Sequence, residues 1–178
     1  CGAVERVCGV RPGIKWPNDP VLEGRKVCGI LTELTGEGAL IVGIGINVSQ
    51  RAEDFTPDVA AMATSLAWAL GRPVSRPALA AALIRELDRQ YAALRSGAWQ
   101  AALDAYRRDC VNLGRQVQLL SAGDRETVTA VGVDEDFGLM VRDAAGAVRT
   151  IRSGEVSVRG LYGYVDSEED AAFPGKGV

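Results

Sequence analysis

Two of the three lysines in this chain lie close together in an apolar stretch near its beginning. Lys15 belongs to the run Gly13-Ile14-Lys15-Trp16-Pro17-Asn18-Asp19, and Lys26 lies just beyond it. Lysine is a compact positive charge, a carboxylate such as that of Asp19 can hold a hard cation, and glycine lets a ligand approach the backbone closely. This combination of residue types is what phosphate chemistry requires.

A purely structural explanation of the same residues stays open. Lys15 and Lys26 fit the role of edge-strand lysines that prevent sheets from pairing with one another. Trp-Pro-Asn-Asp fits an ordinary turn, because Pro, Asn and Asp each favour turns. Taken singly each residue favours that explanation, whereas the combination favours ligand chemistry.

The composition excludes several classes of function. The chain has 178 residues, a formal net charge of −3 and no cluster of Lys and Arg, which argues against a nucleic-acid partner. No apolar run reaches the roughly 18 residues that a membrane span needs. At 24% charged residues the composition is that of a soluble globular protein, and we expect a cytoplasmic location.

The absence of histidine narrows the chemistry further. Without any His the chain has no Ser-His-Asp or Cys-His catalysis and no histidine metal site. The four cysteines form no C-x-x-C pair, so we expect reduced thiols rather than disulfides or a zinc site. Lysine, arginine, carboxylates and backbone amides remain for chemistry.

The apolar pattern predicts a β-hairpin after Lys26. Residues 26–34 and 39–48 are apolar, β-branched runs joined by Thr-Gly-Glu-Gly, and we expect both faces of this sheet to be covered. The second run contains Gly43-Ile44-Gly45-Ile46-Asn47, which lacks the third glycine of a dinucleotide fingerprint. A glycine within a strand marks a bulge or a close ligand. Gly29 on the neighbouring strand favours a shallow trough for a ligand.

Helices are predicted next, followed by short strands. Periodicity predicts the end of a helix within residues 4–10, a brief strand over 14–16, and helices over 59–70, 77–94 and 99–108. The apolar positions of the long helix are expected to be core: Leu79, Leu83, Leu87, Tyr91 and Leu94. Short strands over 117–120, 127–133, 139–142 and 148–151 predict a small barrel after a boundary near residues 110–114. From residue 165 on we expect disorder.

At this point the residues support a resemblance. Lys15-Trp16-Pro17-Asn18-Asp19, then Arg25 to Glu33, then Gly43 to Val48, in this order, resemble the biotin protein ligase family. Residues 153–160, Ser-Gly-Glu-Val-Ser-Val-Arg-Gly, resemble the end of its small C-terminal domain. The match is close over residues 11–50 and looser over 110–163.

The resemblance implies an α+β fold. Residues 1–110 would be part of a mixed-sheet catalytic domain of the class II synthetase-like, biotin/lipoate ligase type, with helices on one face of the sheet. Residues 111–164 would be an SH3-like β-barrel. The chain begins at Cys1 rather than Met, so we expect the N-terminal part of the catalytic domain to be missing. The family's Gly-Arg-rich loop has no counterpart here, and we expect these 178 residues alone to be inactive or nearly so.

The resemblance also implies an activity and its residues. The family forms biotinyl-5′-adenylate from biotin and ATP with Mg²⁺, then transfers biotin to a lysine of a biotin carboxyl carrier protein. Lys26 would be the catalytic residue and would contact biotin and the adenylate phosphate. The other implied contacts are Gly29, Leu31 and Gly43 to biotin, Lys15, Asn18, Asn47 and Arg159 to the nucleotide, and Asp19 to the nucleotide and Mg²⁺.

Two other functions remain open. The chain would otherwise be a non-catalytic dimerisation or binding fragment of such a ligase or of a biotin-responsive repressor, since the family associates through its sheet into homodimers. A lipoate-type ligase on a related fold is the other alternative. The Lys-Trp-Pro-Asn-Asp motif and the Glu-Val-Ser-Val-Arg run favour biotin.

Overall fold

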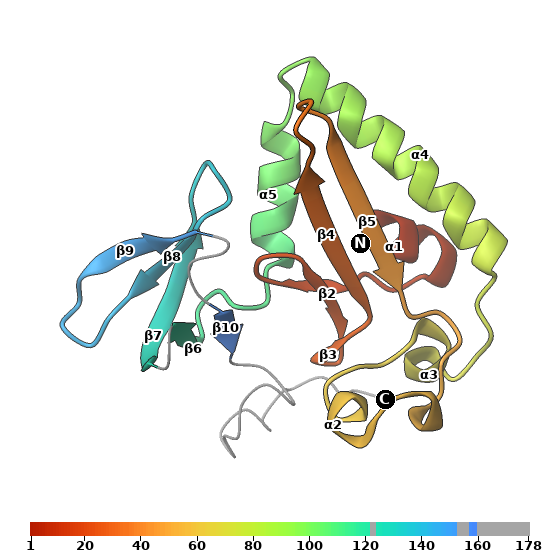
Figure 1. The fold of residues 1–178 in the computed structure, drawn as a ribbon, viewed down its shortest axis with the longest axis horizontal. Coiled ribbons are helices and arrows are strands. Elements are labelled where there is room, and N and C mark those ends of the chain that lie inside the picture. The colour runs from red at the N-terminus through yellow and green to blue at the C-terminus, as the bar shows by residue number, and fades with distance from the viewer. Residues whose placement is uncertain (122–123, 153–156, 160–178) are drawn as a thin grey trace.

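A computed structural model describes residues 1–121, 124–152 and 157–159 of the chain (Figure 1). A paired β-hairpin with helices along one side forms the N-terminal part, and a separate antiparallel sheet forms the C-terminal part (Figure 1). This is the mixed α+β architecture that the sequence predicts. The helices are α1 Gly2–Cys8, α2 Pro57–Ala60, α3 Leu66–Leu70, α4 Arg76–Arg95 and α5 Gln100–Asp109, with a 3-10 turn at Ala52–Asp54.

Five short strands follow α1. The first sheet contains β1 Gly13–Lys15, β2 Asp19–Leu22 and β3 Arg25–Lys26, all antiparallel. The hairpin consists of β4 Cys28–Leu34 and β5 Leu40–Ile46, paired in register from Cys28 opposite Ile46 to Leu34 opposite Leu40. Gly38 has φ 81° in the connecting turn, a conformation that glycine adopts without strain. The predicted hairpin is confirmed.

The predicted helix over residues 59–70 is wrong, because the chain is extended in its middle. Thr64 donates its backbone N–H to the carbonyl of Lys26 at 2.9 Å, and Lys26 donates to the carbonyl of Met62 at 2.8 Å. These pairings with β3 replace helical hydrogen bonds. Ser65 then caps α3, its hydroxyl accepting from Trp68 N–H at 3.1 Å.

Helices α1, α3 and α4 pack on one face of the hairpin and enclose the first core (Figure 1). Its fully buried side chains include Val27 and Leu66. The predicted core stripe of α4 is confirmed only at its N-terminal end, where Leu79 is buried. Leu87, Tyr91 and Leu94 are exposed, because the described chain places nothing over that part of the helix.

The expectation that both faces of the hairpin are covered is also wrong for the described chain. Leu31 is 63% exposed and Leu34 is 74% exposed, and their partners across the turn are exposed as well. Continuous apolar runs usually mark strands covered on both faces. Here the helices cover one face near the base of the hairpin, and the rest lies open.

The C-terminal sheet has five antiparallel strands in the order β10-β6-β7-β8-β9. They are β6 Gln116–Ser121, β7 Asp124–Val133, β8 Leu139–Arg142, β9 Val148–Ile151 and β10 Ser157–Arg159. The predicted strands are confirmed. Within the described ranges, no pairing between β9 and β10 closes the sheet into a barrel. The expected disorder from residue 165 lies outside the described residues.

A second hydrophobic core lies under the C-terminal sheet. It contains Val117, Leu139 and Val141 from the sheet and Leu103 from α5. Trp16, from the Lys-Trp-Pro-Asn-Asp motif near the start of the chain, is buried in the same core with 1% of its surface exposed. The C-terminal sheet is therefore packed directly against the strand that leads into Asn18 and Asp19.

Two features of the whole chain complete the fold. All four cysteines are free thiols, and Cys8, Cys28 and Cys110 are buried, as expected. Among the residues that the structure describes, no helix is both long and apolar enough to cross a membrane.

Candidate ligand-binding site

Six of the predicted site residues line one hollow of about 550 Å³. The hollow lies between the turn that follows Pro17 and the base of the β4–β5 hairpin. Its lining combines one ammonium group, one carboxylate and three glycines. The lining residues are Asn18, Asp19, Lys26, Gly29, Ile30, Leu31, Gly43, Ile44 and Gly45.

Lys26 and Asp19 form an ion pair in this hollow, with Lys26 Nζ 2.6 Å from Asp19 Oδ1. Antiparallel pairing of β2 with β3 brings the two residues onto adjacent strands. The backbone of Lys26 is held on both sides, by Met62 and by Thr64. Its side chain is 35% exposed, so the ammonium group remains accessible to an anionic ligand. The position of this charge is therefore fixed before any ligand binds.

The floor of the hollow is glycine backbone. Gly29 lies directly opposite Gly45, and Gly43 lies opposite Leu31. A Cβ atom at Gly29 would lie 3.2 Å from Lys26 Cε and 3.3 Å from Nζ. Glycine at this position thus leaves room for the lysine side chain, and the paired glycines let a flat ligand lie against the strands. The predicted trough is present.

Asn18 links the turn to the floor. Its side-chain amide donates to the carbonyl oxygen of Ile30 at 2.6 Å. This hydrogen bond ties the segment that carries Asp19 to β4. The amide therefore connects the two walls of the hollow and does more than fix its own turn.

Three predicted site residues are not in the lining. Lys15 is buried, with 6% of its surface exposed. Asn47 donates its side-chain amide to the carbonyl of Thr64 at 3.1 Å, so it joins the end of β5 to the extended segment before α3. The backbone of Arg159 lies in β10, but its side chain is outside the described residues.

Three lining residues were missed by the sequence-based prediction. Gly45 is part of the glycine pattern, and its place opposite Gly29 follows once the hairpin register is known. Ile30 and Ile44 also face each other across the two strands. Their apolar character is typical of buried strand residues, so only the hairpin register indicates that they line the hollow.

Cys28, at the start of β4, has no nucleophilic character here. Burial raises the pKa of its thiol, and the nearby charge of Lys26 offsets this only in part. The thiol therefore stays protonated near neutral pH. The chemistry of the hollow depends on the lysine, the carboxylate, the amide and the backbone.

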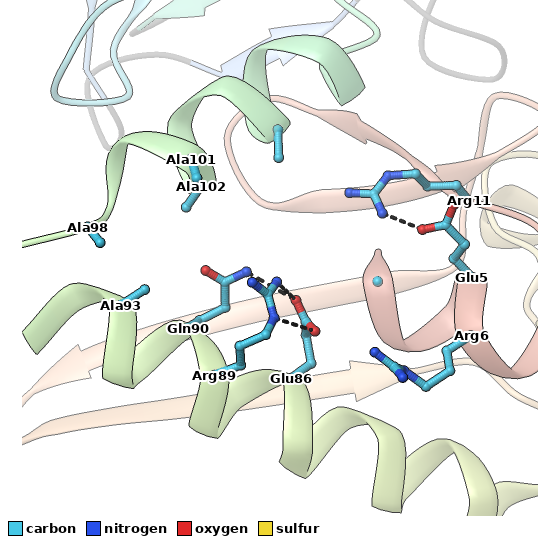
Figure 2. A pocket seen from close by; sticks show the side chains of 12 residues that line it. Glu5, Arg6, Arg11, Glu86, Arg89, Gln90, Ala93, Ala98, Ala101 and Ala102 are labelled. Atoms are coloured by element: carbon cyan, nitrogen blue, oxygen red, sulfur yellow. Dashed lines mark hydrogen bonds and ion pairs between the residues drawn. The ribbon is translucent and has the colours of Figure 1, made fainter. Parts of the chain in front are cut away.

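A second hollow, of about 460 Å³, lies between α1, α4 and α5 (Figure 2). Arg11 is paired there with Glu5 at 2.5 Å and with Asp109 at 2.6 Å, and Arg89 is paired with Glu86. The opposite wall consists of alanines from α4, α5 and the connection between them: Ala93, Ala98, Ala101, Ala102 and Ala105. This hollow contains none of the predicted site residues.

Comparison with known proteins gives consistent matches. A family described as "Biotin protein ligase C terminal domain" matches residues 113–159. The biotin–[acetyl-CoA-carboxylase] ligase of Mycobacterium tuberculosis is 32% identical over 144 residues, which is 81% of this chain and 52% of that protein. The bifunctional ligase/repressor BirA of Bacillus subtilis is 26% identical over 87% of this chain and 49% of that protein. The chain thus spans about half the length of these curated relatives.

Solved structures show the same similarity. The apo biotin protein ligase of Aquifex aeolicus matches with a TM-score of 0.79 and 30% identity, covering 89% of this chain and 69% of that one. The complex of the same ligase with biotin and ATP matches with a TM-score of 0.79 over 66% of its chain. The α+β fold described above is therefore the fold of that class of structures, and at 30% identity over 69% of the solved chain the similarity establishes the family of this chain. The chain belongs to the biotin protein ligase family.

Proposed function

We propose that this chain carries part of an ATP-dependent biotin protein ligase, which forms biotinyl-5′-adenylate and transfers biotin to a lysine of a biotin carboxyl carrier protein. The observation that carries the proposal is the Lys26–Asp19 pair, 2.6 Å apart over the Gly29–Gly45 floor, in a chain of this family. The matched ligases are named for biotin, and one matched structure contains biotin and ATP.

Lys26 would act in the first step. An oxygen of the biotin carboxylate attacks the α-phosphorus of ATP, the bond to pyrophosphate breaks, and a mixed anhydride forms. Both reactants are anions, so a fixed positive charge lowers their repulsion and stabilises the charge that develops in the transition state. The held backbone of Lys26 means that little reorganisation is needed for this role.

The second step releases AMP. The neutral ε-amine of the acceptor lysine attacks the acyl carbon of the mixed anhydride, an amide bond forms, and the bond to the phosphate oxygen breaks. Lys26, close to the phosphate, would again stabilise the departing negative charge. The amine must lose a proton, which passes to solvent or to a nearby base.

The remaining roles follow from the resemblance and the lining. Gly29, Leu31 and Gly43 would contact biotin, because all three line the hollow. Asn18 and Asp19 would face the nucleotide. Lys15, Asn47 and Arg159 are proposed as nucleotide residues on the resemblance alone; the positions of Lys15 and Asn47 outside the lining favour indirect roles.

Asp19 would be the ligand that this chain offers to Mg²⁺. Mg²⁺ at phosphate sites commonly takes one or two carboxylates and completes its shell with phosphate oxygens and water. The described residues contain no cluster of three or more metal-binding side chains, so Asp19 fits the single-carboxylate arrangement. The metal would neutralise phosphate charge; the chain's own contribution is to hold Asp19 beside Lys26.

The proposal extends to the fold and the setting of the protein. We propose that residues 1–110 are part of a class II synthetase-like catalytic domain and residues 111–164 a small SH3-like barrel; the family match over residues 113–159 supports the second assignment. A cytoplasmic setting, with the carrier protein as acceptor, would suit this activity.

A titration tests the proposed function. We expect a non-hydrolysable analogue of biotinyl-5′-adenylate to bind this chain, and Lys26→Ala to weaken binding by about 1.5–3 kcal/mol, the range for a hydrogen bond to a charged group. Isothermal titration calorimetry measures this directly. Arg89→Ala, in the second hollow, is the matched control and should bind like the unaltered chain. Equal affinity of Lys26→Ala and the unaltered chain would contradict the proposed role.

One observation favours a second candidate function, that of a self-associating module. The apolar side chains of the outer hairpin are exposed: Leu31, Leu34, Leu40, Ile41 and Val42. Exposed apolar strands favour pairing with a second copy. Sedimentation velocity of the chain and of Ile41→Lys distinguishes the two, since a binding-competent monomer would exclude self-association as the primary role.

A further inference from the structure

Trp16 joins the C-terminal part of the chain to the segment that leads into the ligand hollow. Trp16 lies three residues before Asp19, yet its ring is buried in the core of the C-terminal sheet. Its indole N–H donates to the carbonyl oxygen of Phe137 at 2.8 Å. Its backbone N–H donates to Asn112 Oδ1 at 2.7 Å. Both polar groups of Trp16 are thus held by residues about a hundred positions later in the chain.

Tyr106 holds Pro17, the residue that follows Trp16. Its hydroxyl donates to the carbonyl oxygen of Pro17 at 2.8 Å. Burial raises the pKa of Tyr106, so the hydroxyl remains a protonated donor. The ring of Tyr106 meets that of Phe137 edge to face, with 5.3 Å between centroids. α5 and the C-terminal sheet therefore hold two successive residues of the turn that leads to Asn18 and Asp19.

The turn that presents Phe137 is built for this contact. Phe137 has φ 63°, a left-handed conformation that is costly for a residue with a side chain. The carboxylate of Asp134 supports it by accepting from the backbone N–H groups of Asp136 and Gly138 at 3.0 and 2.7 Å. A Cβ at Gly138 would lie 2.5 Å from Thr150. The strained backbone directs the Phe137 carbonyl toward Trp16.

Side-chain packing around the Trp16–Pro17 segment is not continuous on every side. A hollow of about 590 Å³ lies beside it, lined by Trp16, Pro17, Tyr106 and Phe137 and by Ile30 and Thr32 of β4. The ring of Trp16 is held by packing in the C-terminal core, and the hydrogen bonds to Trp16 and Pro17 fix the backbone beside this hollow. The hollow leaves space into which the Pro17 side of the segment can move when such a hydrogen bond is removed.

We propose that Trp16, Tyr106 and Asn112 are positioning residues for the ligand hollow, through which the C-terminal sheet holds Asp19 against Lys26. None of the three lines the hollow; they act through the Trp16–Pro17 segment. The inference rests on the proposed function only for what the hollow binds. The positioning itself is a property of the free protein.

A first experiment measures the position of the segment without ligand. Tyr106→Phe removes only the hydroxyl and keeps the ring. We expect the amide ¹H–¹⁵N resonances of Asn18, Asp19 and Lys26 to shift in this variant. Tyr91→Phe, an exposed tyrosine on α4, is the matched control and should leave them unchanged. Unshifted resonances in Tyr106→Phe would overturn the positioning role whatever the protein binds.

A second experiment asks whether the effect passes through Asp19. We expect Tyr106→Phe to weaken binding of the biotinyl-5′-adenylate analogue by roughly 3- to 10-fold, as the loss of one hydrogen bond does. In an Asp19→Asn background the same change should have little further effect, because the group it positions has been altered. Additive losses would mean that Tyr106 does not act through Asp19. Shifted resonances in a chain that binds no analogue would instead refute the proposed function.

Discussion

The hollow at the β4–β5 hairpin and the hollow between α1, α4 and α5 are similar in size and both contain paired charges, yet they differ in the surface that they leave available to a ligand. The hollow at the hairpin measures about 550 Å³ and the one between α1, α4 and α5 about 460 Å³. Each contains carboxylates and basic side chains. Volume and charge content alone therefore do not identify a ligand site.

The difference lies in how the charges are used. Between the helices, Arg11 is paired with Glu5, and Arg89 is paired with Glu86, against a wall of alanine side chains (Figure 2). Arg11 is also paired with Asp109, so it joins α1 to α5, whereas the Arg89–Glu86 pair lies within α4. In the hairpin hollow a lysine faces a single carboxylate over bare glycine backbone. Both hollows therefore present a charged side chain that a ligand can reach, but only the hairpin hollow places it beside glycine backbone that a ligand can approach closely.

Filling the glycine floor gives the sharpest test of this difference. We expect Gly29→Val to weaken binding of the adenylate analogue by at least roughly 10-fold, since a change of one methylene in a pocket already costs about this much and valine adds three carbon atoms. A side chain there would meet Lys26 Cε at 3.2 Å and displace the ammonium group. Calorimetry measures the affinity, and circular dichroism confirms that the variant is folded.

A second glycine provides the control for that change. Gly36, in the hairpin turn, has no atom within 4 Å of an added Cβ. Gly36→Ala should therefore bind like the unaltered chain, and Gly29→Ala should fall between Gly36→Ala and Gly29→Val. If Gly29→Val kept full affinity, the glycine floor would not be the binding surface.

The local parts of this arrangement could be predicted from the sequence. The hairpin, the long helix and the C-terminal strands follow from periodicity and turn residues, which act over a few positions. The grouping of Lys26, Asp19 and Gly29 followed from their closeness in sequence, because one turn and one hairpin bring them together.

The parts that failed depend on distant contacts. The predicted helix over residues 59–70 is interrupted before Ser65 because the chain there pairs with Lys26, nearly forty residues earlier. No local sequence pattern indicates this pairing. The sequence predicts Trp16 at the end of a brief strand before a turn and does not indicate its partners Asn112 and Phe137, which lie in another part of the chain. The prediction that both faces of the hairpin are covered failed for the same reason, because the sequence of an apolar strand does not indicate which residues cover it.

Substitutions in the helical hollow, the one between α1, α4 and α5, should change the stability of the protein rather than its affinity for the ligand. We expect Arg11→Ala to lower the free energy of unfolding by about 1–3 kcal/mol, because the nearly buried carboxylate of Asp109 loses the closer of its two arginine partners and keeps the pair with Arg108. The side chain of Asp109 is only 7% exposed. Urea denaturation measures the loss, and affinity for the adenylate analogue should not change.

Arg89→Ala is the matched comparison in the same hollow. Its side chain is 63% exposed, so its pair with Glu86 should contribute about 0.5 kcal/mol or less. Equal losses in Arg11→Ala and Arg89→Ala would mean that burial does not set the strength of these pairs. A loss of ligand affinity in either variant would contradict the division of roles between the hollows.

The smallest expected effect is that of acid on stability, through the ion pairs of the helical hollow. The hydrogen bond from Arg89 lowers the pKa of Glu86 below its ordinary value of 4.5. Burial alone would raise the pKa of Asp109, but Arg11 and Arg108 lower it below 3.8. Because folding lowers both pKa values, the unfolded chain binds more protons in acid. The stabilisation is complete above about pH 4.5–5 and is lost as the pH falls through the folded-state pKa values.

Urea midpoints measured between pH 6 and pH 3 check the sign of this effect. The midpoint of the unaltered chain should fall with acid, and the fall should be shallower in Arg11→Ala combined with Arg89→Ala, because the two carboxylates then titrate closer to their unfolded values. An equally steep fall in the double variant would assign the acid sensitivity to other carboxylates. A shallower fall would assign the acid sensitivity to the pairs of Arg11 and Arg89 with their carboxylates in the helical hollow, and the Lys26–Asp19 pair would then act in binding.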